Sequence, residues 1–171
     1  VGQLFEQVRV ARVDGVGRQQ QGVAICGGPG DQLGSESPSM NPTPPSPPSP
    51  LDGLRVLDLS KVLAGPLCAQ YLGDMGADVI KIETPDQGDE TRHWPPFREH
   101  GESRTGAVFL SANRNKRSLC LDLRSEEGRA VIYRLAKWAD ITIASFGPGV
   151  AEKLGVDAAA LRASNPRLIY C

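Results

Sequence analysis

From Leu51 onward, apolar and polar residues follow one another in the pattern of alternating strands and helices. Residues 54–60 and 77–83 are short runs rich in Val, Ile and Leu that predict buried strands. The apolar residues that fall on one helical face between them are Leu67, Tyr71, Leu72 and Met75. A strand, a helix and a second strand form a βαβ unit with a right-handed crossover, so these two strands are predicted to be parallel.

The same alternation continues along the second half of the chain. Further strands are expected at residues 118–123 and 141–146, and a last one begins at Arg167. Ser125 is predicted to cap a helix whose first turn places Glu126 and Glu127 at the positive end of the helix dipole. The residues that give this helix its buried face are Val131, Ile132, Leu135 and Ala139.

Two shorter helices are predicted near the end of the chain. One lies within residues 147–155, with Pro148 at a first-turn position, and the other within residues 157–166. The predicted fold class is therefore α/β, a doubly wound, Rossmann-like parallel sheet with flanking helices. Ligands of such sheets bind at the carboxyl ends of the strands. The first of these loops lacks the GxGxxG fingerprint, which argues against a nicotinamide or flavin dinucleotide.

The organisation changes near residue 50. The segment "MNPTPPSPPSP", Met40 to Pro50, favours an extended polyproline conformation. We predict that residues 1–50 are a disordered leader, non-native before Met40; a genuine disordered extension is the alternative. Residues 51–171 form the folded part. Because the chain stops inside an apparent strand, we expect this part to be truncated.

Charge and cysteine content restrict the partners. A formal net charge of -1 gives no field that would attract nucleic acid or an anionic membrane, so the partner is predicted to be a small molecule. The four cysteines are widely spaced, which predicts neither a zinc site nor a disulfide framework but reduced thiols in the cytoplasm. Cys68 and Cys120 lie in apolar runs and are expected in the core. No run approaches the roughly 20 apolar residues that span a bilayer.

Several motifs in order carry a resemblance. They are "LDGLRVLDLSKVLAGP", "LGDMGADVIKIETP" with "GDETR", "NRNKRSLCLDL", "FGPGVAEKLG" and "NPRLIYC", and they span residues 51–171. This region resembles the amino-terminal part of a class III CoA-transferase, a family that includes formyl-CoA, carnitine and dicarboxylate CoA-transferases and is related to α-methylacyl-CoA racemases. The resemblance implies the first portion of a Rossmann-like large domain, a second smaller domain, and an interlocked homodimer when the protein is full length.

The resemblance also implies a reaction. Coenzyme A passes from an acyl-CoA donor to a carboxylic acid acceptor through an aspartyl mixed anhydride and an enzyme–CoA thioester, which is nucleophilic catalysis. The family's Asp lies beyond Cys171, so no catalytic residue is assigned here and the segment alone is expected to be inactive. Acyl-CoA is a substrate, and no prosthetic group or metal is expected. The cytoplasm is the expected compartment, with the mitochondrial matrix as the alternative in a eukaryote.

The positions that match the family's CoA-binding surface are Lys61, Leu63, Thr84, Leu121, Arg124, Ser145, Phe146, Val150 and Lys153. Lys61 and Leu63 replace a His and a Gln of formyl-CoA transferase, which argues against formyl or oxalyl specificity. Coenzyme A carries phosphates and an adenine, which require cations, backbone N–H groups and an apolar slot. Arg124 and Lys153 offer charge, and the turn after Phe146 offers N–H groups. The alternative for these residues is a structural role, as solvated ions, a core aromatic and a turn.

The mixed loop "GDETRHWPPF" contains carboxylates and a histidine without the one-face spacing of a metal or acid/base site. We therefore interpret it as a segment that steers the chain over the mouth of the sheet. Within the family it looks closest to the dicarboxylate-type transferases. Two other functions stay open: an acyl-CoA racemase, which would exchange an α-proton by means of a His and an Asp, and a non-catalytic nucleotide-binding module.

Overall fold

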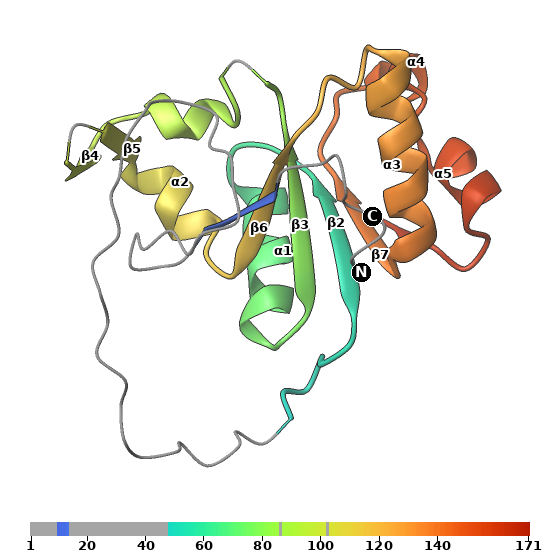
Figure 1. Cartoon of the computed structure of the whole chain (residues 1–171), viewed down its shortest axis with the longest axis horizontal. Helices are drawn as coiled ribbons and strands as arrows, with labels where there is room; N and C mark the ends of the chain where they lie inside the picture. The colour runs from blue at the N-terminus through green and yellow to red at the C-terminus, as the bar shows by residue number, and fades with distance from the viewer. Residues whose placement is uncertain (1–9, 14–47, 86, 102) are drawn as a thin grey trace.

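A computed structural model describes residues 10–13, 48–85, 87–101 and 103–171. Its main element is a six-stranded sheet with the strand order β1-β6-β3-β2-β7-β8 (Figure 1). The strands are β1 Val10–Val13, β2 Arg55–Leu59, β3 Asp78–Glu83, β6 Lys116–Cys120, β7 Ile141–Ala144 and β8 Ile169–Tyr170. The last five run parallel, and β1 pairs antiparallel with β6. The predicted parallel α/β fold is confirmed.

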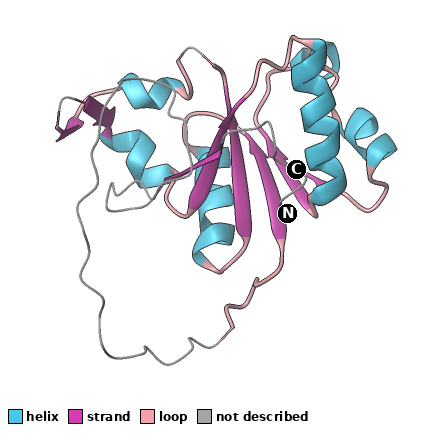
Figure 2. Ribbon diagram, in the orientation of Figure 1, coloured by secondary structure: helices cyan, strands magenta, loops and turns pink. Residues whose placement is uncertain are grey.

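Helices cover both faces of this sheet (Figure 2). Helix α1, Ala64–Asp74, packs on one face, whereas α3, Glu126–Trp138, and α5, Ala158–Ser164, pack on the other. A short helix, α4, Val150–Leu154, precedes α5. The remaining elements, η2 Glu90–His93, α2 Ala107–Ala112 and the hairpin of β4 Phe97–His100 and β5 Ser103–Gly106, form a separate group beside the sheet (Figure 1).

The main apolar core lies between the sheet and α3. Leu57 of β2 and Ile80 of β3 are fully buried there against Ile132 and Leu135 of α3. Ser125 caps α3 as predicted, because its hydroxyl oxygen accepts a hydrogen bond from the Gly128 N–H at 2.9 Å. A capped, amphipathic helix therefore closes this face of the sheet.

Thr142 in β7 is fully buried, and its hydroxyl has no hydrogen-bond partner among the described residues. An unpaired buried hydroxyl costs free energy, so Thr142→Val is expected to raise the free energy of unfolding by about 1 kcal/mol. Urea unfolding measures this change. Thr91→Val is the control and should destabilise, because the buried Thr91 hydroxyl donates to Asp89 Oδ1 at 2.7 Å. A less stable Thr142→Val variant would contradict the prediction.

Strand β1 corrects one expectation. Val10–Val13 was included in the predicted disordered leader, but its backbone pairs with Lys116 to Leu119. The reason is that β6 would otherwise end the sheet with unpaired N–H and C=O groups, which any extended segment can satisfy. The other residues before Asn41, and the proposed boundary near Met40, lie outside the described residues.

The helical face of α1 that the sequence suggested is only partly buried. Tyr71 and Met75 are 58% and 41% exposed, and Cys68 is exposed rather than in the core. Small residues lie against the sheet instead: Ala69 is fully buried, and a Cβ at Gly73 would lie 3.0 Å from the Asn115 carbonyl. Because α1 lies close to the sheet, only small side chains fit between them, and the larger side chains of α1 point away from the sheet.

Three smaller expectations also change. Strand β6 begins at Lys116, two residues before the predicted start, and ends at Cys120. Cys120 is half-buried and disulfide-bonded, so the prediction of reduced core thiols is wrong at this position, whereas Cys171 is a free, exposed thiol. Pro148 precedes the Gly149 cap of α4 and is not in its first turn.

Among the described helices, none is long and apolar enough to cross a membrane.

Candidate functional site

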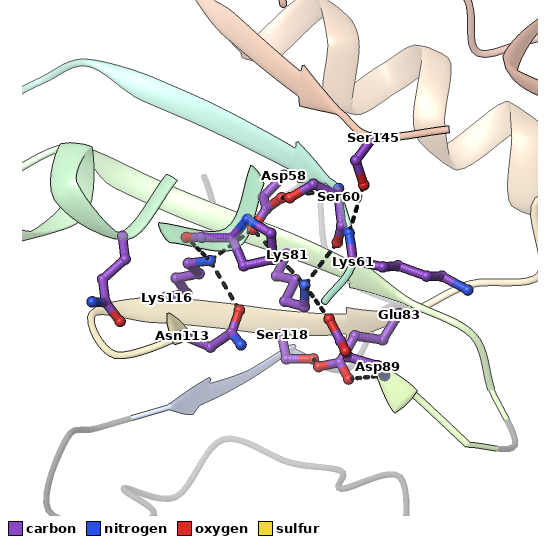
Figure 3. Close-up of polar contacts among 12 residues, drawn as sticks. Asp58, Ser60, Lys61, Lys81, Glu83, Asp89, Asn113, Lys116, Ser118 and Ser145 are labelled. Atoms are coloured by element: carbon purple, nitrogen blue, oxygen red, sulfur yellow. Dashed lines mark hydrogen bonds and ion pairs between the residues drawn. The ribbon is translucent and has the colours of Figure 1, made fainter. Parts of the chain in front are cut away.

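The face of the sheet beneath α1 carries buried charged residues. Successive side chains of a strand point to opposite faces, so every second residue of β2, β3 and β6 belongs to this face. The buried polar residues that it presents are Asp58, Lys81, Glu83, Lys116 and Ser118 (Figure 3). Buried charges are stable only when they are paired and hydrogen-bonded.

Lys116 forms the first of these pairs. Its Nζ donates to Asp58 Oδ2 at 2.8 Å, to the Pro66 carbonyl at 2.8 Å and to Asn113 Oδ1 at 2.9 Å. All three hydrogens of the ammonium group are therefore used. Burial lowers the pKa of Lys116 to about 8, although the Asp58 carboxylate opposes this shift.

Lys81 forms the second pair. Its Nζ donates to the Ser60 carbonyl at 2.8 Å and lies 3.0 Å from Asp89 Oδ2. The other Asp89 oxygen caps η2 by accepting the Thr91 N–H at 3.0 Å. Burial acts to raise the pKa of Asp89, but the Lys81 charge and the Thr91 hydrogen bonds outweigh it and hold the pKa below its usual value.

Glu83 joins the end of β3 to the loop that follows. It accepts from Arg92 Nε at 2.7 Å and Nη2 at 2.8 Å, from the Ser118 hydroxyl, and from the Asp89 N–H at 2.9 Å. Burial acts to raise the pKa of Glu83, but Arg92 and the other donors lower it to about 2. The acidic loop is thus tied back to the sheet, which agrees with its interpretation as a steering segment.

A low pKa at Glu83 predicts acid sensitivity. A carboxyl group with a folded pKa of about 2 and an ordinary value of 4.5 contributes roughly 3 kcal/mol of stability, present above pH 4.5 and lost as the pH falls toward 2. Unfolding of wild type and Glu83→Gln at about pH 6 and about pH 3 tests this through linkage. The loss on acidification should shrink in Glu83→Gln but persist in Glu99→Gln, whose carboxylate is exposed. An equal loss in all three proteins would contradict the prediction.

These buried charges hold the loop that joins β2 to α1. Val62 in this loop has a φ of +69°, the left-handed region that a β-branched residue rarely adopts. Its N–H donates to Asp89 Oδ2 at 3.3 Å, and the neighbouring Lys61 N–H donates to the Ser145 hydroxyl at 2.9 Å. The loop conformation is therefore fixed by contacts from Lys81 in β3, from Asp89 at the N-cap of η2 and from Ser145 directly after β7.

A pocket of about 280 Å³ opens at the carboxyl ends of β2, β3, β6 and β7. It is lined by Leu59, Lys61, Ile82, Glu83, Thr84, Leu121, Asp122, Leu123, Arg124, Phe146 and Leu154. Most of these side chains are apolar; Lys61 and Arg124 bring two exposed cations to the lining, and Glu83 and Asp122 bring two carboxylates that are hydrogen-bonded to arginines. An apolar pocket with convergent cations suits a ligand that combines a ring or chain with anionic groups.

Comparison with known proteins identifies the family, because the sequence model of CoA-transferase family III matches residues 51–171. The chain belongs to this family. Succinate–glutarate CoA-transferase of Agrobacterium fabrum is 50% identical over 125 residues, which cover 71% of this chain and 31% of that protein. Succinyl-CoA:mesaconate CoA-transferase of Haloarcula hispanica is 49% identical over 121 residues, which cover 70% of this chain and 30% of that protein.

Solved structures agree with this assignment. A CaiB/BaiF family protein from Brucella suis matches with a TM-score of 0.70 and 48% identity, over 73% of this chain and 33% of that chain. A protein of Mycobacterium tuberculosis, Rv3272, matches with a TM-score of 0.65 and 42% identity, over 74% of this chain and 33% of that chain. The chain spans about a third of the length of these relatives.

The structure brings together part of the surface that the resemblance to CoA-transferases suggested. Five of the nine positions line the pocket, namely Lys61, Thr84, Leu121, Arg124 and Phe146. The other four, Leu63, Ser145, Val150 and Lys153, do not line it. Leu63 is the N-cap residue of α1 and 45% exposed, and Ser145 holds the Lys61 backbone.

Two of the predicted ligand groups already have partners within the chain. Arg124 is exposed, and its Nε and Nη2 contact Asp122 Oδ1 and Oδ2 at 3.0 and 3.3 Å. This hydrogen bonding lowers the pKa of Asp122. The Val150 N–H at the start of α4 donates to the Gly147 carbonyl at 3.1 Å. The expectation that the turn presents its N–H groups is therefore wrong for Val150.

Sequence reasoning missed the buried charges of this CoA-transferase segment. Asp58, Lys81, Lys116 and Asp89 were given no role, although a signal for the first two was present. Asp58 in "RVLDL" and Lys81 in "DVIKIE" each lie between apolar residues of a strand, whereas Lys116 begins the polar half of "KRSLC". Within the described ranges, no group of three or more potential ligand side chains could hold a metal ion.

Proposed function

We propose that a full-length protein carrying this segment transfers coenzyme A from an acyl-CoA donor to a carboxylic acid, and that residues 51–171 supply part of its CoA-binding surface. The observation that supports this most directly is the pocket at the carboxyl ends of the strands, where five residues that match the family's CoA positions converge. In open α/β sheets this edge is where ligands bind.

The lining suits one portion of coenzyme A. Leu59, Ile82 and Phe146 offer an apolar surface for the adenine or the pantetheine chain, and Lys61 and Arg124 offer charge to its phosphates. The volume of about 280 Å³ lies at the lower end of small-ligand sites, so this segment is expected to hold only part of the molecule.

The chemistry follows the family pattern in this proposal. The carboxylate of an Asp beyond Cys171 attacks the thioester carbonyl, and the carbon–sulfur bond breaks. CoA departs as the thiolate, and the Asp and the donor acyl group are now joined as a mixed anhydride. The thiolate then attacks the aspartyl carbonyl and releases the donor acid, which leaves an enzyme–CoA thioester. The acceptor carboxylate attacks this thioester and releases the thiolate, which attacks the acceptor's acyl carbonyl and regenerates the Asp carboxylate. None of the carboxylates in residues 51–171 is assigned to this role.

The named relatives also support a substrate class and a setting. The names of the two transferases from Agrobacterium fabrum and Haloarcula hispanica contain succinate or succinyl-CoA with glutarate or mesaconate, so we propose a dicarboxylic donor or acceptor such as succinyl-CoA with a second diacid. We also propose an interlocked homodimer in the cytoplasm. The exposed apolar side chains of Tyr71 on α1 and of Met75, its C-cap residue, agree with a covering element in the complete assembly.

A transfer assay tests the proposal. The full-length protein is incubated with succinyl-CoA and glutarate, and new glutaryl-CoA is measured by chromatography, with free CoA as the hydrolysis control. Glutaryl-CoA without free CoA is expected, while residues 1–171 alone should give only background. Exchange of an α-proton of a branched acyl-CoA without transfer would instead indicate a racemase. CoA binding without either reaction would indicate a binding module.

A further inference from the structure

The loop that carries Lys61 to the pocket is shaped from behind by buried charges. The Ser60 carbonyl accepts from Lys81 Nζ at 2.8 Å, and the Val62 N–H donates to Asp89 at 3.3 Å. Lys81 and Asp89 are 1% exposed and lie 3.0 Å apart. One ion pair therefore holds the backbone on both sides of Lys61.

The conformation that this pair holds is unfavourable by itself. Val62 has a φ of +69°, and a β-branched residue persists there only where the surroundings determine the backbone. Figure 3 shows the consequence, with the Lys61 side chain extending away from the buried charges. The turn at Val62 thus separates an inward-facing polar network from a cation that lines the pocket.

We propose that Lys81 and Asp89 are positioning residues, which act through the left-handed turn at Val62 to place the Lys61 ammonium group at the pocket for an anionic group of the ligand. This inference rests on the proposed function, because the ligand that Lys61 meets is taken to be CoA. Lys81 and Asp89 themselves are buried on the opposite face of the sheet and do not line the pocket.

A double-mutant cycle distinguishes positioning from general support of the fold. Asp89→Asn keeps the size of the side chain but removes the charge that faces Lys81. If Asp89 acts through Lys61, Asp89→Asn weakens CoA binding about fivefold in the wild-type background and hardly at all in the Lys61→Ala background. A structural role would weaken binding by the same factor in both backgrounds.

Two further variants keep the test decisive. Glu90→Gln removes a carboxylate from the exposed neighbour of Asp89, so it should leave CoA affinity unchanged. Val62→Gly leaves the ion pair intact but frees the turn, since glycine adopts positive φ without strain and many other conformations as well. Val62→Gly should also weaken CoA binding only when Lys61 is present. It can replace Asp89→Asn in the cycle if that variant fails to fold.

Hydrogen exchange of residues 60–66 in the full-length protein without CoA supplies a readout independent of the ligand. Faster exchange in Asp89→Asn than in Glu90→Gln is expected. Equal exchange, or equal losses of affinity in both Lys61 backgrounds, would overturn the positioning role. A wild-type protein that binds no CoA would overturn the proposed function and the assigned ligand, while exchange would still decide whether the pair holds the loop.

Discussion

Replacing Asp58 by Ala is expected to lower the free energy of unfolding by about 3–5 kcal/mol, because it leaves Lys116 buried without its counter-ion. The Asp58 side chain is fully buried, 2.8 Å from Lys116 Nζ and 4.0 Å from Lys81 Nζ. The Lys116 ammonium would keep two neutral acceptors, which do not neutralise it. Urea unfolding of the full-length protein measures the loss.

Asp78→Ala provides the matched control. Asp78 is also an aspartate in a strand and lies 2.6 Å from Arg117, but its side chain is 48% exposed. Solvent screens such a pair, so its loss should cost at most about 1 kcal/mol. The double variant Asp58→Ala with Lys116→Met should recover part of the lost stability, because it removes the unpaired charge. Equal losses for Asp58→Ala and Asp78→Ala would contradict the prediction.

Arg124→Ala is expected to weaken CoA binding by the full-length protein about tenfold, because a charge-assisted hydrogen bond to a phosphate contributes roughly 1.5–3 kcal/mol. Stability should hardly change, since the Arg124 side chain is 79% exposed and its pair with Asp122 lies at the surface. Arg124→Lys should recover only part of the affinity, because lysine keeps the charge but loses the planar fork. Calorimetric titration of CoA at low and high salt measures both effects, and the difference should fade at high salt.

Arg114→Ala is the control for this experiment. Arg114 forms a surface pair with Asp74 at 2.6 Å but precedes β6, at the end of the sheet remote from the pocket. Arg114→Ala removes one positive charge, as Arg124→Ala does, but it does not change the lining of the pocket, so CoA affinity should stay at the wild-type value. If Arg124→Ala and Arg114→Ala bind CoA equally well at low salt, Arg124 is only a surface ion.

The sequence by itself determined the order and direction of the main elements. Runs of apolar residues with period two or period 3.6 identify strands and helices locally, and the crossover rule then makes the strands parallel. Ser125 and the helix that it caps were predicted correctly for this reason. The sequence also determined the family, because ordered motifs over residues 51–171 need no tertiary information.

Only the tertiary structure decided with which partners the charges pair. Asp58 lies beneath α1 between two lysines, whereas Asp78 pairs with Arg117 at the surface. The pairing of β1 with β6 and the outward position of Tyr71 depend equally on contacts between distant segments. Burial and ion pairing are properties of neighbours in space. The ion pair of Lys81 and Asp89, which holds the loop around Lys61, therefore depends on the packing of β3 against the segment that leads into η2.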